Sequence, residues 1–204
     1  MVDIAILLFA YLIGSIPFGY IITRLIRDVD IRHYGSGNIG ATNVLRLLGW
    51  KLGLLVFLLD AAKGVAAVLL AGAISDQDAL PFLAGLAVLL GHCFPIFLKF
   101  KGGKGAATGI GVIAALSVWA ALLVLLLAAA VIAATRYVSL GSILGAMSAP
   151  LIFWLLGYDA AHIYFGIVAA LIIVLRHHAN IARLLKGTEA KIGQRSGPAG
   201  GGSE

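Results

Sequence analysis

Long apolar segments separated by short polar ones make up most of the sequence. Six runs of hydrophobic residues are long enough to cross a membrane as helices, for which about 20 apolar residues are needed. They occupy residues 4–22, 52–74, 79–98, 106–135, 137–158 and 160–175. Only 12% of the residues are charged, which is roughly half the share of a soluble domain. The pattern predicts an all-α integral membrane protein.

The fourth run, residues 106–135, is too long for one straight crossing. Thirty helical residues would extend ~45 Å, whereas the hydrocarbon core is ~30 Å thick. We therefore predict a hairpin of two short helices that breaks near residues 116–119 and begins and ends on the same side. The fold then has seven helices.

The basic residues are concentrated in three of the segments between or after these runs. They are Arg24, Arg27, Arg32, Arg46 and Lys51; Lys99, Lys101 and Lys104; and Arg176, Arg183, Lys186, Lys191 and Arg195. The other connections, "MVD", "SDQD" and "GYD", contain no base. The positive-inside bias therefore predicts that all three basic segments face the cytoplasm, with the N-terminus outside and the C-terminus inside.

One membrane domain is expected over residues 1–192. The remaining stretch, 193–204, reads "GQRSGPAGGGSE" and is rich in glycine and polar residues. We interpret it as a flexible tail, either a linker or a cloning remnant. The single cysteine, Cys93, excludes an internal disulfide.

The first basic segment contains "GSGNIGATNVLR", whose glycines Gly35, Gly37 and Gly40 match the spacing G-x-G-x-x-G, with Asp60 following 20 residues later. A dinucleotide-binding loop needs a buried strand before it and a βαβ unit around it. Here a charged stretch precedes the loop, and Asp60 lies inside an apolar run. We reject the dinucleotide-binding interpretation.

The other two basic segments have similar chemistry. They read "GHCFPIFLKFKGGKGAATG" and "RHHANIARLLKGTE". Backbone amides of Gly-rich turns and helix N-termini bind anions, and Lys and Arg add full charges. "GGKG" lacks both the first glycine and the Ser or Thr of a P-loop. Together the three segments predict a site for a phosphate-bearing substrate, although glycine packing and headgroup anchoring remain alternatives.

Five other ionisable residues lie within the apolar runs or at their ends. Asp60 and Lys63, spaced i, i+3, are either functional or a structural pair bracing the basic segments. His92 and Cys93 are neighbours in sequence and cannot face each other on a helix, so we interpret them as packing residues. His177 is a candidate contact for a phosphate or hydroxyl group.

Taken together, the three segments resemble the three motifs of the PlsY family of membrane acyltransferases, and the resemblance covers nearly the whole chain. The family transfers a fatty acyl group from acyl-phosphate to glycerol 3-phosphate and releases lysophosphatidic acid and phosphate. It implies a seven-helix fold in the bacterial plasma membrane with a cytoplasmic active site. It also implies glycerol 3-phosphate, acyl-phosphate and membrane lipid as partners, no cofactor or metal, and no nucleic acid.

Carried over by position, the resemblance implies roles for residues in all three motifs. The catalytic residues it implies are Ser36, Arg46, Lys104, His177 and Asn180. The substrate-binding residues it implies are Gly35, Gly37, Asn38, Thr42, Gly102, Gly103 and Gly105. Glu189 matches a family acid that we expect to order its loop.

No histidine has an aspartate five positions later, so the H-x-x-x-x-D base of other glycerol-phosphate acyltransferases is absent. Acyl-phosphate carries a good leaving group, so orientation and charge neutralisation are expected to suffice. Either a substrate phosphate or His177 accepts the hydroxyl proton, and no acyl-enzyme is expected. A carrier for organophosphate anions is disfavoured by the base-free outer loops, a scaffold leaves the motifs unexplained, and a CDP-alcohol transferase lacks its Asp-rich motif.

The predicted orientation can be tested by cysteine labelling. Cysteines placed at Gln77 and Tyr158 should react with an impermeant reagent from outside the cell. Cysteines at Arg136 and Thr188 should react only after the membrane is opened. External labelling at position 136 would contradict the hairpin in residues 106–135.

Overall fold

The computed structural model describes residues 2–194, and the helix-forming parts of this range contain ten α-helices and two short 3-10 helices. Most of the expected tail, 195–204, lies outside the described residues. The α-helices are α1 (Val2–Ser15), α2 (Phe18–Arg27), α3 (Ala41–Leu48), α4 (Trp50–Ile74), α5 (Leu80–Cys93), α6 (Ala106–Leu116), α7 (Val118–Thr135), α8 (Val138–Leu155), α9 (Ala160–Arg176) and α10 (His178–Leu185).

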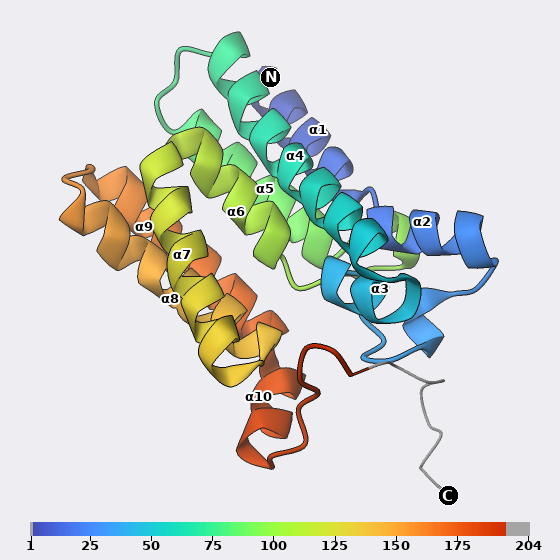
Figure 1. Cartoon of the computed structure of the whole chain (residues 1–204). Helices are drawn as coiled ribbons and strands as arrows, with labels where there is room; N and C mark the ends of the chain where they lie inside the picture. Colours follow the sequence, from blue (N-terminus) through green and yellow to red (C-terminus); the bar gives the residue numbers. More distant parts are fainter. Residues whose placement is uncertain (1, 195–204) are drawn as a thin grey trace, which may run out of the picture.

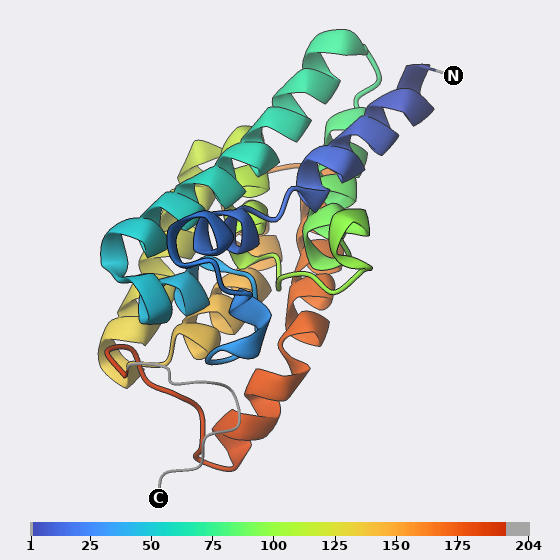
Figure 2. The ribbon, with the colours of Figure 1, turned by 90° about the vertical axis from the view of Figure 1, so that its right-hand side faces the viewer.

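The long helices form two groups that lie side by side (Figure 1). In one group α1 packs on α5 and α4 packs on α6; in the other, α8 packs on both α7 and α9. Segments 28–40, 94–105 and 177–194 gather at one end of the bundle, opposite the N-terminus of α1 (Figures 1 and 2). We call this end, which carries all three motifs, the basic end.

Five helical stretches are long and apolar enough to cross a membrane. They are Val2–Arg27, Trp50–Ile74, Leu80–Leu98, Val118–Thr135 and Val138–Leu155. A sixth is formed if α9 and α10, which meet at a 62° bend, count as one. The all-helical membrane fold is thus confirmed.

The count of seven helices is incomplete. The seven expected helices are present as α1 and α4 to α9. In addition, the end of the first run and the basic residues after it form α2, and the basic segments add α3 and α10. The first apolar run is also interrupted, because Pro17 has no amide hydrogen and disfavours helix at Ile16 before it.

The break in residues 106–135 falls within the predicted interval. Helix α6 ends at Leu116, and Ser117 leaves the helical conformation with φ −160° and ψ 111°. Its hydroxyl oxygen then accepts a hydrogen bond from the Ala120 amide at 3.1 Å and caps α7. Helix α7 returns to the basic end, where Arg136 donates to the Ile192 carbonyl oxygen at 3.2 Å. The predicted break is confirmed, but the expectation of two short helices is wrong for α7, which has 18 residues and is long enough to cross a membrane by itself.

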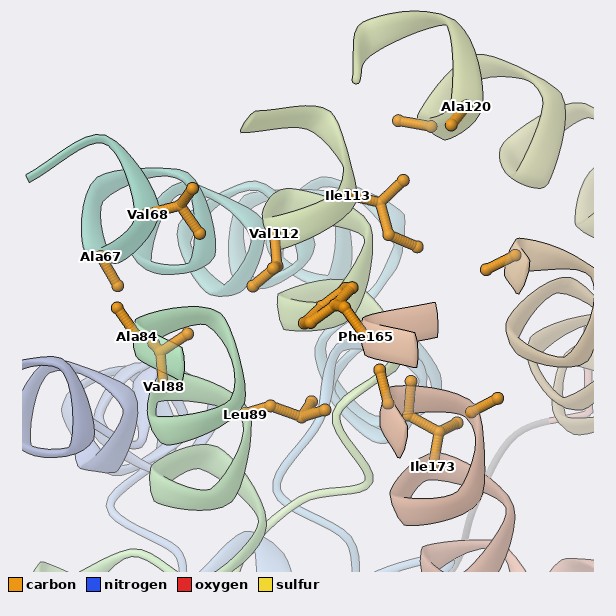
Figure 3. Close-up of a cluster of buried hydrophobic side chains, with 14 of the residues drawn as sticks. Ala67, Val68, Ala84, Val88, Leu89, Val112, Ile113, Ala120, Phe165 and Ile173 are labelled. Atoms are coloured by element: carbon orange, nitrogen blue, oxygen red, sulfur yellow. The ribbon is translucent and has the colours of Figure 1, made fainter. Parts of the chain in front are cut away.

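Small residues allow α4 and α6 to approach closely. A Cβ added at Gly64 would overlap the Thr108 carbonyl, and one at Gly111 would overlap the Ala61 carbonyl. Such contacts are typical of membrane helices, which gain stability from close packing. Beside this contact, Phe165 of α9 points into the space between α5 and α6 (Figure 3). This tightly packed half of the bundle forms one wall of the site.

Candidate active site

A cavity of about 520 Å³ lies between α4 and α6 on one side and α7 and α8 on the other, and it reaches the basic end. Its polar wall is formed by Ser36, Asn38, Thr42, Arg46, Lys104, Ser139, His177, Asn180 and Glu189. Its apolar wall includes Leu54, Phe57, Ile110, Ile113, Val124, Leu125, Ala128, Ile132 and Ala146. The cavity therefore suits a ligand with a polar head and an apolar chain.

The first loop is held in shape by a buried side chain, Asn43 of α3. Its Oδ1 accepts a hydrogen bond from the Ser36 amide at 3.2 Å. Its Nδ2 donates to three carbonyl oxygens, those of Ile31, Tyr34 and Asn38, at 3.3, 2.9 and 2.9 Å. One signal of this role is visible in the sequence, a polar residue in the first turn of a helix, and our interpretation missed it.

Gly35 and Gly37 shape this loop and do not line the cavity. Their φ angles are 56° and 68°, in the left-handed region that favours glycine. The next residues, Asn38 and Thr42, do line the cavity, as does the exposed Ser36. The two glycines thus position their neighbours and are not themselves at the cavity wall.

Two helices direct their N-termini at the cavity. Helix α3 starts after Gly40 and α6 after Gly105, and neither has a side-chain cap. The first residues of both helices line the cavity. Uncapped N-termini present free amide groups and a positive dipole end. The polar wall therefore favours an anion from two directions.

Arg46 and Lys104 add full charges at this wall. Arg46 donates from Nη2 to the Ala190 carbonyl oxygen at 2.9 Å, while its buried Nε has no hydrogen-bond partner among the described residues. Burial also lowers the pKa of Arg46 from its usual value.

The Lys104 ammonium is partly desolvated. Burial is the main reason why its pKa lies at about 8. The charges of Arg183, Arg46 and Arg176 lower the pKa too, whereas Glu189 raises it. An anion in the cavity would offset this excess of positive charge.

The second loop corrects part of the expected binding set. Of Gly102, Gly103 and Gly105, only Gly105 lines the cavity. The Gly103 amide donates to the His92 carbonyl oxygen at 3.0 Å, so it is not free for an anion. Arg176 donates to the Gly103 and Gly102 carbonyl oxygens at 3.1 and 3.2 Å. These glycines pack the turn that carries Lys104.

In the third motif, His177 and Asn180 are both buried and both line the cavity. His177 Nδ1 lies 2.7 Å from the Ile173 carbonyl oxygen, which can only accept, so Nδ1 carries the hydrogen. Nε2 is then an acceptor, and it has no hydrogen-bond partner among the described residues. Asn180 donates from Nδ2 to Glu189 at 2.6 Å, and its Oδ1 has no partner among the described residues. Both side chains thus offer an acceptor for a hydroxyl group.

Glu189 fastens the segment after α10 to the bundle. Besides Asn180, its carboxylate accepts hydrogen bonds from Ser139 and Arg183, each at 2.7 Å. Burial alone would raise the pKa of Glu189, but these hydrogen bonds outweigh it and hold the pKa below its usual value. Glu189 is therefore ionised and orders this segment.

Asp60 and Lys63 form a buried ion pair, with 2.7 Å between Oδ1 and Nζ. His92 from α5 joins them, its Nδ1 lying 3.5 Å from the same oxygen. Both Asp60 and His92 reach the cavity. The sequence interpretation of His92 as a packing residue missed this contact, because it joins two different helices.

The carboxylates of the cavity are thus already engaged. Asp60 faces Lys63 and His92, and Glu189 accepts three hydrogen bonds. Within residues 2–194, no group of three or more His, Cys, Asp or Glu side chains is arranged to hold a metal ion.

The sequence matches the family model described as glycerol-3-phosphate acyltransferase over residues 4–187. The chain belongs to the glycerol-3-phosphate acyltransferase family. The family resemblance inferred from the three motifs is therefore confirmed, and so is the expectation of an acyltransferase enzyme.

Relatives of the same family cover almost the full chain. The glycerol-3-phosphate acyltransferase of Desulforamulus reducens is 48% identical, with 94% of this chain and 96% of that protein covered. That of Shouchella clausii is 47% identical, with 94% and 97% covered. The crystal structure of PlsY, an integral membrane glycerol 3-phosphate acyltransferase, in its glycerol 3-phosphate form superposes with a TM-score of 0.90 at 44% identity, covering 95% and 96%. Its lysophosphatidic acid form gives a TM-score of 0.87 at 42% identity, covering 95% and 97%.

The pKa of Lys104 predicts how acyltransferase activity depends on pH. A protonated ammonium attracts phosphate and a neutral amine does not, so kcat/KM for glycerol 3-phosphate should fall as the pH rises through about 8. Lys104→Arg keeps its charge at higher pH and should move this decline upward, even if its activity at pH 7 is lower. A decline at the same pH in both proteins would show that another group is responsible.

Proposed function

We propose that the protein transfers a fatty acyl group from acyl-phosphate to the 1-hydroxyl group of glycerol 3-phosphate. The products are lysophosphatidic acid and phosphate. The observation that carries the proposal is the cavity, in which two partly buried cations and two uncapped helix N-termini lie at one end of an apolar groove. The two ligands named for the PlsY crystal structures, glycerol 3-phosphate and lysophosphatidic acid, have the matching chemistry.

The acceptor substrate needs hydrogen-bond donors for its phosphate and acceptors for its hydroxyl groups. Arg46, Lys104 and the N-termini of α3 and α6 supply the donors, with Ser36, Asn38, Thr42 and the Gly105 turn beside them. His177 Nε2 and Asn180 Oδ1 supply the acceptors. This division of donors and acceptors supports glycerol 3-phosphate as the polyol.

The donor is proposed to be acyl-phosphate because the site offers little base catalysis. The cavity does contain an Asp and a His in contact, but the Nε2 edge of His92 packs against Gly103 and is closed to a ligand. A mixed anhydride needs less assistance than a thioester, since phosphate is a good leaving group that cations stabilise. The cationic end of the cavity suits such a leaving group.

In the proposed reaction, the 1-hydroxyl oxygen attacks the carbonyl carbon of acyl-phosphate. A new ester bond forms, the bond between the carbonyl carbon and the phosphate oxygen breaks, and phosphate leaves with the electron pair. The hydroxyl proton passes to His177 Nε2 or to a phosphate oxygen. Arg46 and Lys104 neutralise the phosphate charges, while the apolar groove aligns the acyl chain. The product can leave sideways into the bilayer.

We further propose that the basic end faces the cytoplasm of a bacterial inner membrane and that residues 1–192 form one domain. The gathering of three Lys- and Arg-rich segments at one end of the bundle supports this orientation. The match of one family model over residues 4–187 supports a single unit.

The donor can be identified with the purified protein. Given glycerol 3-phosphate, the protein should form lysophosphatidic acid from acyl-phosphate and negligible product from acyl-CoA or acyl carrier protein. The reason is that a thioester would need stronger base catalysis than His177 and the substrate phosphates offer. Efficient use of acyl-CoA would refute this donor assignment. Vesicles containing the protein should not accumulate glycerol 3-phosphate without acyl transfer.

The two cations of the cavity predict specific kinetic losses. Charge-assisted hydrogen bonds of this kind contribute ~1.5–3 kcal/mol, so Arg46→Ala and Lys104→Ala should each lower kcat/KM by about 10- to 100-fold. Arg46→Lys should restore little, because a point charge does not reproduce the planar guanidinium.

Matched controls lie in the same parts of the chain. Lys101 is exposed three residues before Lys104, and Arg27 is exposed at the end of α2. Alanine at either position should leave kcat/KM within about twofold, since an exposed headgroup contact contributes only ~1 kcal/mol to membrane binding. If Arg46→Ala and Lys104→Ala fold and behave like these controls, the proposed phosphate site is wrong.

A further inference from the structure

The buried cluster of Asp60, Lys63 and His92 has no part in the proposed reaction, although it lies at the cavity. The three side chains belong to α4 and α5 and are only 2%, 4% and 4% exposed. One carboxylate oxygen, Asp60 Oδ1, lies 2.7 Å from Lys63 Nζ and 3.5 Å from His92 Nδ1. Neither Asp60 Oδ1 nor His92 Nδ1 has a hydrogen-bond partner among the described residues, so these contacts are electrostatic. Ionisable side chains buried within membrane helices are unfavourable in free energy, so we expect this cluster to have a function.

Lys63 anchors one side of the cluster. Its Nζ donates to the Ile16 carbonyl oxygen at 3.0 Å, where the chain breaks before Pro17, and lies 5.6 Å from the centre of the Phe18 ring. The ammonium is thereby fixed, and it fixes the Asp60 carboxylate. This end of the cluster ties α4 to the break between α1 and α2.

His92 extends the other side of the cluster to the second loop. A Cβ added at Gly103 would overlap the Nε2 edge of its imidazole ring, so ring and backbone are in direct contact. The His92 carbonyl oxygen accepts the Gly103 amide at 3.0 Å. Arg176 also donates hydrogen bonds to the Gly103 and Gly102 carbonyl oxygens of this turn. The turn is clamped one residue before Lys104.

We propose that Asp60 and His92 are positioning residues, in which the Asp60 carboxylate fixes the imidazole ring against Gly103 and thereby places Lys104 in the phosphate site. The inference rests on the proposed function of Lys104. It also gives a reason for glycine at position 103, where any side chain would push the turn away from the ring.

Two single substitutions test the two ends of this contact. Asp60→Asn removes the charge that orients His92. Gly103→Ala places a methyl group against the imidazole ring and pushes the turn away from it, without changing a residue of α4 or α5. Because small misplacements of a binding group cost large factors in rate, each should lower kcat/KM for glycerol 3-phosphate at pH 7 by at least about tenfold. Gly103→Ala keeps the test decisive if Asp60→Asn leaves Lys63 unpaired and prevents folding.

The pH dependence of kcat/KM distinguishes a displaced Lys104 from a general loss of folded enzyme. Lys104 has a pKa of about 8 because it is buried among several charged and titratable groups. Those facing it are Arg46 of α3, Arg176 and His177 at the end of α9, Arg183 of α10, and Glu189. A displaced Lys104 is more hydrated, so the alkaline decline in kcat/KM should move to higher pH in both variants. Loss of folded enzyme alone would lower the rate without moving the decline.

Adding His92→Ala to Gly103→Ala should partly restore the activity that Gly103→Ala loses. His92→Ala removes the ring that the alanine at position 103 strikes, so the double variant should be more active than the product of the two single effects predicts. His162→Ala is the matched control, because His162 packs against Phe82, Phe153 and Tyr158 and does not line the cavity. It should leave the profile unchanged.

Each outcome decides the proposal. Normal kcat/KM in Gly103→Ala, or losses with no movement of the alkaline decline, would overturn it. If His92→Ala lowered kcat/KM by more than about 1000-fold and abolished the decline of kcat/KM at low pH, His92 would be the general base and not a positioning residue. The proposed function is judged separately, by product formation from acyl-phosphate in the unaltered protein; if that protein uses a different donor, the same comparisons are made with it.

Discussion

The site depends on positive charge that the protein itself leaves incompletely neutralised. Arg46 and Lys104 are brought out of bulk water beside two uncapped helix N-termini, and burial lowers the pKa of both. The carboxylate at the same wall, Glu189, is already bound by Ser139, Asn180 and Arg183. Desolvated cations are unfavourable without a counter-charge. Binding of an anion offsets this unfavourable desolvation, so the charge of the site is complementary to a phosphate-bearing ligand.

Keeping these charges in place requires that loops distant in sequence hold one another. Arg46 binds the carbonyl of Ala190, Arg176 binds those of Gly102 and Gly103, and the Arg136 side chain binds that of Ile192. Each link joins segments at least 56 residues apart. A guanidinium can serve several carbonyl and phosphate oxygens at once, whereas an ammonium is a compact charge. This explains why arginines link the segments, while Lys104, which forms no hydrogen bond or ion pair within residues 2–194, remains available at the cavity wall.

Sequence reasoning succeeded where one physical limit dominated. The mismatch between a 30-residue apolar run and the bilayer thickness predicted a break near residues 116–119, and the structure has it at Ser117. The bias of Lys and Arg identified the end that carries the cavity. It failed where a role depends on a partner from elsewhere in the chain, as for Asn43, Gly103 and His92. Helices α2, α3 and α10 were missed because a search for continuous apolar runs passes over short amphipathic helices.

The same reasoning explains how the groove and the charges divide the work on a lipid substrate. An acyl chain that moves from the bilayer into an apolar groove exchanges one hydrocarbon environment for another, so little hydrophobic free energy is gained. The groove, which has α4 and α6 on one side and α7 and α8 on the other, can therefore align the acyl chain but cannot supply most of the binding affinity. On the proposed function, affinity must come from the phosphate end, where desolvated cations meet the anion. The positions of Arg46 and Lys104 then control both binding and alignment for attack. Such control requires a rigid turn before Lys104, and contacts with His92 and Arg176 hold the turn at Gly102 and Gly103.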